Sequence, residues 1–224
     1  MEEEEQLLKL DKIHLKIAYL YMAADGKIES QELAYFNEIG KCYQRFEDEK
    51  DIIIQYCDEV LNSGYTPFDA IKKIINGQEL KLKNTSAISN NIPLFHDFNY
   101  FSALPNKENA TLLWVLINLG YADGDYSQPE KDIVSLIAKK CKFPDDLLLE
   151  YEDIAKTFEV LEKHKAELDE QKKPYSYIKK ILFFKIKKTH AGKSKADIED
   201  ELSDISEDYQ KLIESVFFLI NEWE

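Results

Sequence analysis

Residues 24–32 read Ala-Asp-Gly-Lys-Ile-Glu-Ser-Gln-Glu, and residues 122–130 read Ala-Asp-Gly-Asp-Tyr-Ser-Gln-Pro-Glu. The two strings stand 98 residues apart, and the same offset also pairs apolar residues outside them, such as Leu15 with Leu113. A chance match of short strings does not extend to flanking apolar positions. The sequence therefore indicates two copies of one helical unit.

Each copy is expected to form four helices. In the first copy, apolar spacing predicts helices over about 10–21, 33–43 and 47–64, and Thr66-Pro67 begins a fourth as a capping residue followed by proline. In the second copy, helices are expected from Asn106, around Ile133–Ile137 and from Asp145 to Leu168, and Pro174 is expected to begin the fourth. The last helix has no counterpart in the first copy.

The predicted fold is all-α, with two four-helix units at residues 1–76 and 106–190 and a long acidic amphipathic helix at 191–224. Residues 77–105 form a connector that contains turn residues and many apolar ones, so we expect it to pack across both units. The connector also holds His96-Asp97, the one pair of residues worth inspecting for a grafted function.

The repeated string matches the second half of an EF-hand calcium loop, with Asp at position 5, Gly at 6 and Glu at 12. The oxygen donors of positions 1 and 3 are absent in both copies, which excludes a high-affinity EF-hand. Weak Ca²⁺ or Mg²⁺ binding by the acidic turns stays open. The candidate metal ligands are Asp25, Glu29, Glu32, Asp123, Asp125 and Glu130.

A purely structural interpretation of the same residues is the favoured one. Gly26 and Gly124 suit the left-handed conformation that ends a helix, and Ser127 with Glu130 has the spacing of a capping box. In the first copy Glu29 stands in place of the capping Ser, which is expected to weaken the cap and to leave an extra carboxylate.

Met22 to Glu32 and Tyr121 to Glu130 resemble the signature of the TerB-like helical domain of tellurite-resistance proteins and membrane-anchored DnaJ-type co-chaperones. The resemblance covers about residues 7–76 and 106–188. It implies a non-catalytic, all-helical module of bacterial stress, envelope or phage-defence systems, with acidic loops that correspond here to Asp25, Glu32, Asp123 and Glu130. The His-Pro-Asp tripeptide of a J-domain is absent, so stimulation of Hsp70 is not implied.

The charges near the C-terminus fall into two blocks. Residues 171–196 carry nine Lys and no acid, whereas residues 197–224 carry ten acids and one Lys. We expect two antiparallel helices that neutralise each other, with Gly192 in the turn. The alternative, a site for phosphate or an anionic membrane surface, is less favoured. The residues of the basic stripe recur every seven positions and are Lys173, Lys180 and Lys187.

The last helix carries apolar residues from Leu202 to Trp223 at alternating spacings of three and four, which favours a helical partner. That partner is the second unit, a second copy of the chain in a homodimer, or another protein. Tyr209 and Trp223 are the candidate partner-binding residues of this helix.

Composition excludes several classes of function. The chain has 224 residues and a net charge of -14, so nucleic acid is not an expected partner. Three separated Cys, an acidic N-terminus and no long apolar run predict a cytoplasmic protein without disulfides, structural zinc or a transmembrane segment. The four His show no catalytic spacing, and His14 lies among apolar helical positions, as a core histidine does.

The predicted function is that of a non-enzymatic interaction module of a bacterial stress-response or phage-defence system, which docks a partner protein and requires no cofactor. The first alternative is a weak Ca²⁺ or Mg²⁺ sensor that uses the acidic turns. The second is a metal-dependent hydrolase, which requires the two turns to converge on a shared metal pair.

Overall fold

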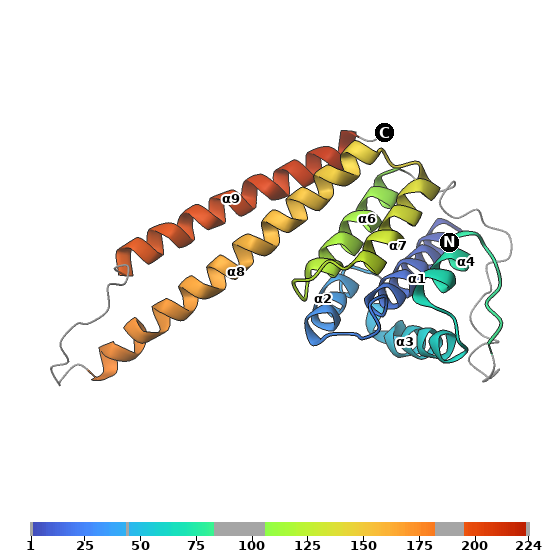
Figure 1. The fold of residues 1–224 in the computed structure, drawn as a ribbon, viewed down its shortest axis with the longest axis horizontal. Coiled ribbons are helices and arrows are strands. Elements are labelled where there is room, and N and C mark those ends of the chain that lie inside the picture. The colour runs from blue at the N-terminus through green and yellow to red at the C-terminus, as the bar shows by residue number, and fades with distance from the viewer. Residues whose placement is uncertain (1, 44, 83–105, 182–194, 223–224) are drawn as a thin grey trace.

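The computed structural model describes residues 2–43, 45–82, 106–181 and 195–222 (Figure 1). Within these ranges the chain forms helices and no strands, so the all-α prediction is confirmed. None of the described helices is both long enough and apolar enough to cross a membrane. The helices are α1 (Glu2–Met22), α2 (Ser30–Gly40), α3 (Phe46–Asn62), α4 (Pro67–Ile75), α6 (Asn106–Tyr121), α7 (Gln128–Cys141), α8 (Asp145–Ile181) and α9 (Lys195–Glu222).

Helix α1 is the centre of the body. Every residue from Ile13 to Met22 is buried, because α2, α3, α4, α6 and α7 all pack around it. A helix enclosed on all sides is expected to be apolar on all sides, and this stretch carries only two polar exceptions, His14 and Lys16. His14 is 5% exposed and its ring meets Tyr43 edge to face, which confirms that it is a core histidine.

The two halves of the chain share one core. Helix α6 packs on α1 and α2, and α4 packs on α7. Between the halves, Lys140 Nζ donates to Asn76 Oδ1 at 2.9 Å. The predicted connector lies largely outside the described residues, so its packing stays a prediction. Direct contact between helices joins the halves, and neither half stands apart as a separate unit (Figure 1).

Several helix starts agree with the sequence because their signals are local. The Thr66 hydroxyl accepts a hydrogen bond from the Asp69 amide at 3.1 Å, and Pro67 occupies the first helical position. This arrangement satisfies one of the amide groups left without a partner at a helix start. Helix α2, in contrast, ends at Gly40 and not at the predicted Tyr43.

The prediction that Pro174 begins a separate helix is wrong. Helix α8 runs for 37 residues, from Asp145 through Pro174 to Ile181. A proline removes one backbone hydrogen bond and disturbs the preceding turn, so it can bend a long helix without ending it. Among the described residues, the second half therefore shows no short fourth helix that would correspond to α4.

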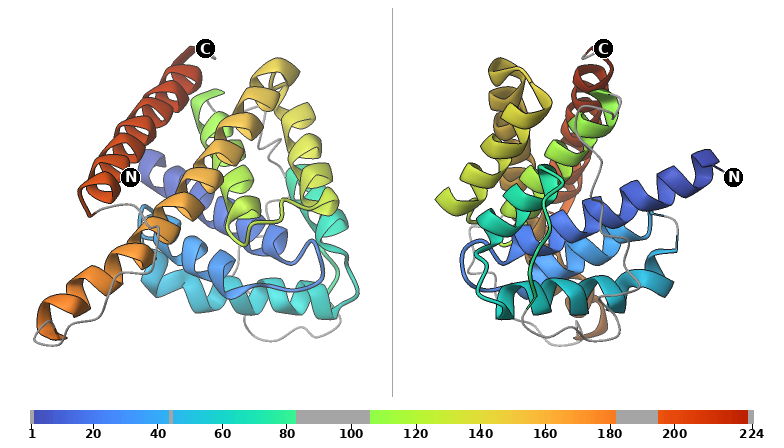
Figure 2. Two further views of the ribbon diagram at one scale, coloured as in Figure 1. Left: turned by 60° about the vertical axis from the view of Figure 1, so that its left-hand side comes forward. Right: turned by 90° about the vertical axis from the view of Figure 1, so that its right-hand side faces the viewer.

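Helices α8 and α9 pair antiparallel and form an arm that extends from the body (Figures 1 and 2). The Phe158 ring meets the Tyr209 ring with centroids 5.1 Å apart, and His164 Nε2 lies 3.1 Å from Glu201 Oε1. Toward the far end, Leu168 and Ile205 are buried in a small apolar cluster of their own.

This register does not pair the described parts of the two charge blocks, as the predicted neutralisation would require. The contacts of Tyr209 and Glu201 place the acidic helix against residues 158–165 of α8, whereas the basic block begins only at residue 171. The part of α8 from Asp145 to Glu170 is itself acidic, with ten acids and three Lys. The apolar residues between the helices set this register, and the charge blocks do not.

Candidate functional site: the paired acidic turns

The two acidic turns, 98 residues apart in the chain, lie beside each other where α1 and α6 end. The Tyr21 hydroxyl lies so close to Gly120 that a Cβ there would approach it to 2.5 Å. Helix α2, which follows the first turn, packs on α6, which precedes the second. The structure therefore brings together four of the predicted metal ligands, Asp25, Glu32, Asp123 and Glu130, whose charges act on one another across the two turns.

Both turns are built in the same way at their start. The Lys27 amide donates to Asp25 Oδ1 at 3.1 Å, and the Asp125 amide donates to Asp123 Oδ1 at 2.9 Å. The glycine between each such pair has a positive φ, +102° at Gly26 and +90° at Gly124. Only glycine adopts this backbone conformation without strain, so these glycines are needed for the turn itself.

Both turns also end in a capping box. Glu130 Oε2 accepts from the Ser127 amide at 2.7 Å, as the sequence predicts. Glu32 Oε2 accepts from the Glu29 amide at the same distance, 2.7 Å, so the first copy is capped as well. The expectation that Glu29 leaves a surplus carboxylate is wrong, because its side chain takes part in this capping box and pairs with Lys27 Nζ. The weaker cap stays a prediction.

The two capping glutamates are buried acids. Glu32 and Glu130 are each 4% exposed. Burial raises the pKa of the Glu32 carboxyl to about 7; the hydrogen bond from the Glu29 amide opposes this rise, and the charges of Glu130 and Asp123 add to it. Burial likewise raises the pKa of Glu130 to about 7, against the hydrogen bonds from Ser127 and with the added charges of Asp123 and Asp25.

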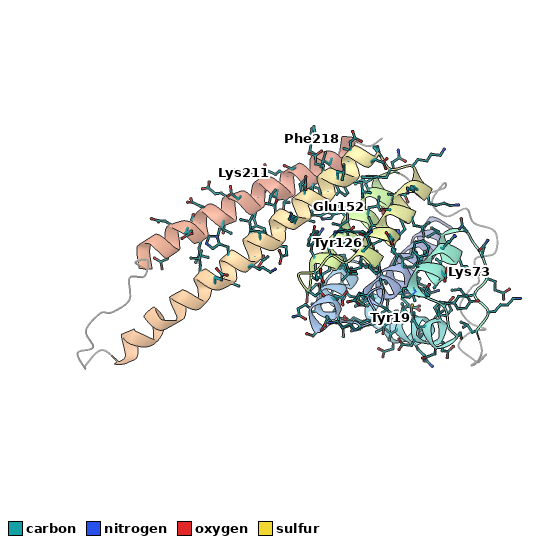
Figure 3. All side chains as sticks on the ribbon, in the orientation of Figure 1. Tyr19, Lys73, Tyr126, Glu152, Lys211 and Phe218 are labelled. Carbon is teal, nitrogen blue, oxygen red and sulfur yellow. The ribbon has the colours of Figure 1, made fainter. Side chains whose placement is uncertain are left out.

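Two tyrosines meet at Gly120, beside the turns. Tyr21 is fully buried, and among the described residues its hydroxyl has no hydrogen-bond partner. The Tyr126 hydroxyl donates to Glu152 Oε1 of α8 at 3.1 Å (Figure 3). Burial, reinforced by Glu152, raises the pKa of Tyr126 far above its usual range. Burial also raises the pKa of Tyr21 well above its usual range, so both hydroxyls stay protonated under physiological conditions.

Helix α8 completes one side of the site. Lys163 Nζ and Glu159 Oε1 lie beside Gly124, 3.2 Å and 3.4 Å from the position that a Cβ would take there, and the two side chains pair with each other. A further acid and a base of α8 thus flank the second turn, whereas Asp25, Asp123 and Asp125 at the rim are exposed.

The predicted partner-binding residues lie elsewhere. Tyr209 is inside the arm, with its ring against Phe158 and with Lys165 Nζ 5.6 Å from the ring centroid. Lys173 and Lys180 belong to α8, in a stretch whose side chains the structure does not describe. Lys187, Trp223 and the His96-Asp97 pair lie outside the described residues.

Sequence reasoning missed Tyr21, Gly120 and Glu152. The 98-residue offset pairs Tyr21 with Leu119, so the repeat itself gives no signal for a tyrosine there. Gly120, in the last turn of α6, was an available signal, because a glycine inside a helix marks a place where another group approaches closely.

The described residues include no group of three or more His, Cys, Asp or Glu that is arranged to hold a metal ion. No protein-family model matches the chain, and comparisons with curated proteins and with solved structures found no match either. The TerB-like resemblance therefore rests on the two motif strings alone and stays a prediction.

Proposed function

We propose that this chain is a non-enzymatic interaction module that docks a partner protein, with the paired acidic turns as its docking surface. The observation that carries the proposal is that Asp25 and Asp123, both exposed and from two separate turns, lie near enough for the charges of both to act on Lys27. By its TerB-like resemblance, we assign the module to a bacterial stress-response or phage-defence system.

The chemistry of the surface defines the partner. Carboxylates predominate, and the nearby Lys27 and Lys163 are each paired with a glutamate. A lysine- or arginine-rich segment of a protein complements such a surface. An exposed ion pair contributes about 0 to 1 kcal/mol, so several carboxylates acting together are needed for useful affinity and for fast, electrostatically steered association.

Binding of a labelled lysine-rich helical peptide, measured by fluorescence anisotropy, tests this surface. The test variant combines Asp25→Asn and Asp123→Asn, which keeps an oxygen acceptor for each turn and removes two charges. The control combines Asp48→Asn and Asp51→Asn, two exposed residues of α3 with the same change of net charge. We expect the test variant to bind about tenfold more weakly, equivalent to about 1.4 kcal/mol, and the control to bind almost as the wild type does. An equal loss of affinity in the test variant and in the control would show that binding depends on net charge alone, and it would reject this docking surface.

A second candidate function is a weak response to Ca²⁺ or Mg²⁺. It is favoured by the same proximity of the two acidic turns. Carboxylates are the ligands that these cations prefer, and four of them come from the two turns together. The buried Tyr21 hydroxyl, without a partner among the described residues, adds a further oxygen near them. Because no ready-made metal group is present among the described residues, binding would require the rim aspartates to rearrange.

Calorimetry with millimolar Ca²⁺ or Mg²⁺ tests the second candidate. We expect heat from the wild type and none from the variant with Asp25→Asn and Asp123→Asn, whereas the α3 control keeps it. Absence of heat from the wild type would end the sensor hypothesis without affecting peptide docking. The metal-dependent hydrolase stays a prediction. The two acidic turns lie beside each other, as that function requires, and an assay of hydrolytic activity tests it.

A further inference from the structure

We propose that the α8–α9 arm pairs with the arm of a second copy of this chain, so that the outer face of α9 meets the lysine-rich end of α8 in the other copy. This interface is separate from the acidic turns and does not depend on the function proposed for them. Three observations support it: an exposed apolar patch, an acidic stripe beside it, and the register of the arm.

The apolar patch lies near the C-terminal end of α9. Phe217 and Phe218 are each 61% exposed and Ile213 is 39% exposed, and Phe218 projects outward from the arm (Figure 3). Ile213 and Phe217 stand four residues apart, so they lie one above the other on the helix. The opposite face of α9 is already used, because Leu212, Val216 and Leu219 pack on the core. Two phenylalanines exposed side by side are typical of a surface that another chain covers.

An acidic stripe continues from this patch toward the far end of the arm. Asp200, Glu207 and Glu214 recur every seven residues and are all exposed. A spacing of seven keeps residues on one face of a helix. A helix that fits this face therefore carries both apolar and basic residues, and its basic residues repeat with the same period.

The register of the arm leaves the described part of the basic block, residues 171–181 of α8, beyond the acidic stretch of α9. Because Glu201 lies against His164 and Tyr209 against Phe158, the part of α8 from Lys173 onward extends past the contacts with the acidic helix. The chain thus presents an acidic stretch near the body and a basic stretch near the end of the arm, and its own fold does not bring their described parts together.

A second copy supplies the matching helix. Lys173 and Lys180 of α8 are also seven residues apart, in a sequence that includes Ile178 and Ile181. Two arms that lie side by side in opposite directions place the basic end of each against α9 of the other, in a twofold-symmetric and self-complementary interface. The 28 residues of α9 span about 42 Å, which is long enough for such an overlap.

Sedimentation velocity on the full chain tests the proposal. At about 100 μM and low salt we expect a dimer, and we expect its dissociation constant to rise at least about tenfold in high salt, which screens exposed charges. The variant with Phe217→Ser and Phe218→Ser is expected to be monomeric. A control with Leu33→Ser and Ile52→Ser, which changes exposed apolar residues on α2 and α3, is expected to dimerise as the wild type does.

Charge exchange identifies the contact itself. The variant with Lys173→Glu and Lys180→Glu and the variant with Glu207→Lys and Glu214→Lys are each expected to be monomeric, and their mixture is expected to form a dimer. Circular dichroism confirms that each variant stays helical. A wild type that is monomeric under these conditions, or a mixture that does not associate, overturns the proposal. Association only with a different protein would assign the patch to another partner.

Discussion

At the scale of single residues, the sequence predicted which side chains build the acidic turns but not how the turns meet. Ser127 and Glu130 could be recognised because a capping box is a local pattern. The contact of Tyr21 with Gly120 depends on how α1 packs against α6, and no spacing within either copy encodes it. The same packing buries Glu32 and Glu130, which local patterns would have left on the surface.

The first prediction concerns pH. Burial raises the pKa of Glu32 and Glu130 from 4.5 to about 7, so the folded chain binds more protons than the unfolded chain between these values. Stability gained by protonation is therefore complete below about pH 4.5 and is lost as the pH rises through 7. Replacing both by Gln, which keeps a capping oxygen, is expected to raise the free energy of unfolding at pH 8 by about 1 to 3 kcal/mol.

Urea unfolding at pH 5.5 and pH 8 measures this effect as the difference between the wild type and the variant with Glu32→Gln and Glu130→Gln. Comparing the two proteins cancels the titration of the other carboxylates. An advantage of the variant that is as large at pH 5.5 as at pH 8 would contradict the assignment of the pH effect to these two groups.

The second prediction contrasts two tyrosines of the same site. Tyr21→Phe removes a buried hydroxyl that has no partner among the described residues, and it is expected to leave the free energy of unfolding unchanged or to raise it by about 1 kcal/mol. Tyr126→Phe removes a hydroxyl that donates to Glu152, and it is expected to lower the free energy of unfolding by about 1 kcal/mol. Urea unfolding of both variants checks the contrast, which a loss at Tyr21 equal to that at Tyr126 would refute.

At the scale of helices, starts were easier to predict than ends and continuations. Thr66-Pro67 begins α4 as predicted, because the capping hydroxyl and the proline act within one turn. Pro174 was given too much weight, because a proline removes one backbone hydrogen bond and can bend a long helix without ending it. The relative register of α8 and α9 was mispredicted because the charge blocks suggested one pairing and the apolar contacts impose another.

The third prediction separates the two interpretations of Pro174. Within a continuous helix, Pro174→Ala restores a backbone hydrogen bond and is expected to raise helicity at 222 nm and to stabilise the arm by up to about 3 kcal/mol. At the first position of a separate helix, the same change would be neutral or slightly unfavourable. Circular dichroism through a thermal transition distinguishes the two, and an unchanged signal would argue against the continuous α8.

At the scale of the whole molecule, two copies of a motif do not make two domains. Helix α1 is enclosed by helices from both halves, and α4 packs on α7, so the apolar core is continuous across the repeat. Self-similarity along the sequence predicts repeated structure, but it does not tell whether the copies fold apart or around a shared helix. The burial of α1 indicates a shared helix, because a four-helix unit alone would leave part of the surface of α1 exposed to water.

The fourth prediction follows from that shared core. A fragment of residues 1–82 is expected to be largely unfolded, because the faces of α1, α2 and α4 that meet α6 and α7 would be exposed to water. Adding a fragment of residues 106–224 is expected to restore helicity and a dispersed amide spectrum by NMR. A well-folded 1–82 fragment would show instead that the first copy is an independent domain.

Helix α8 also fixes a distance. It passes the second acidic turn at Glu159 and Lys163 and then continues to Ile181, about 27 Å further along the helix. A binding surface at the second acidic turn and one at the C-terminal end of α8 are therefore held apart by a rigid helix and not by a flexible linker. Two chains paired through their arms would accordingly present two acidic surfaces at a set separation. Such an arrangement selects ligands by valency: a target with two basic sites at that spacing gains avidity, and a target with one does not.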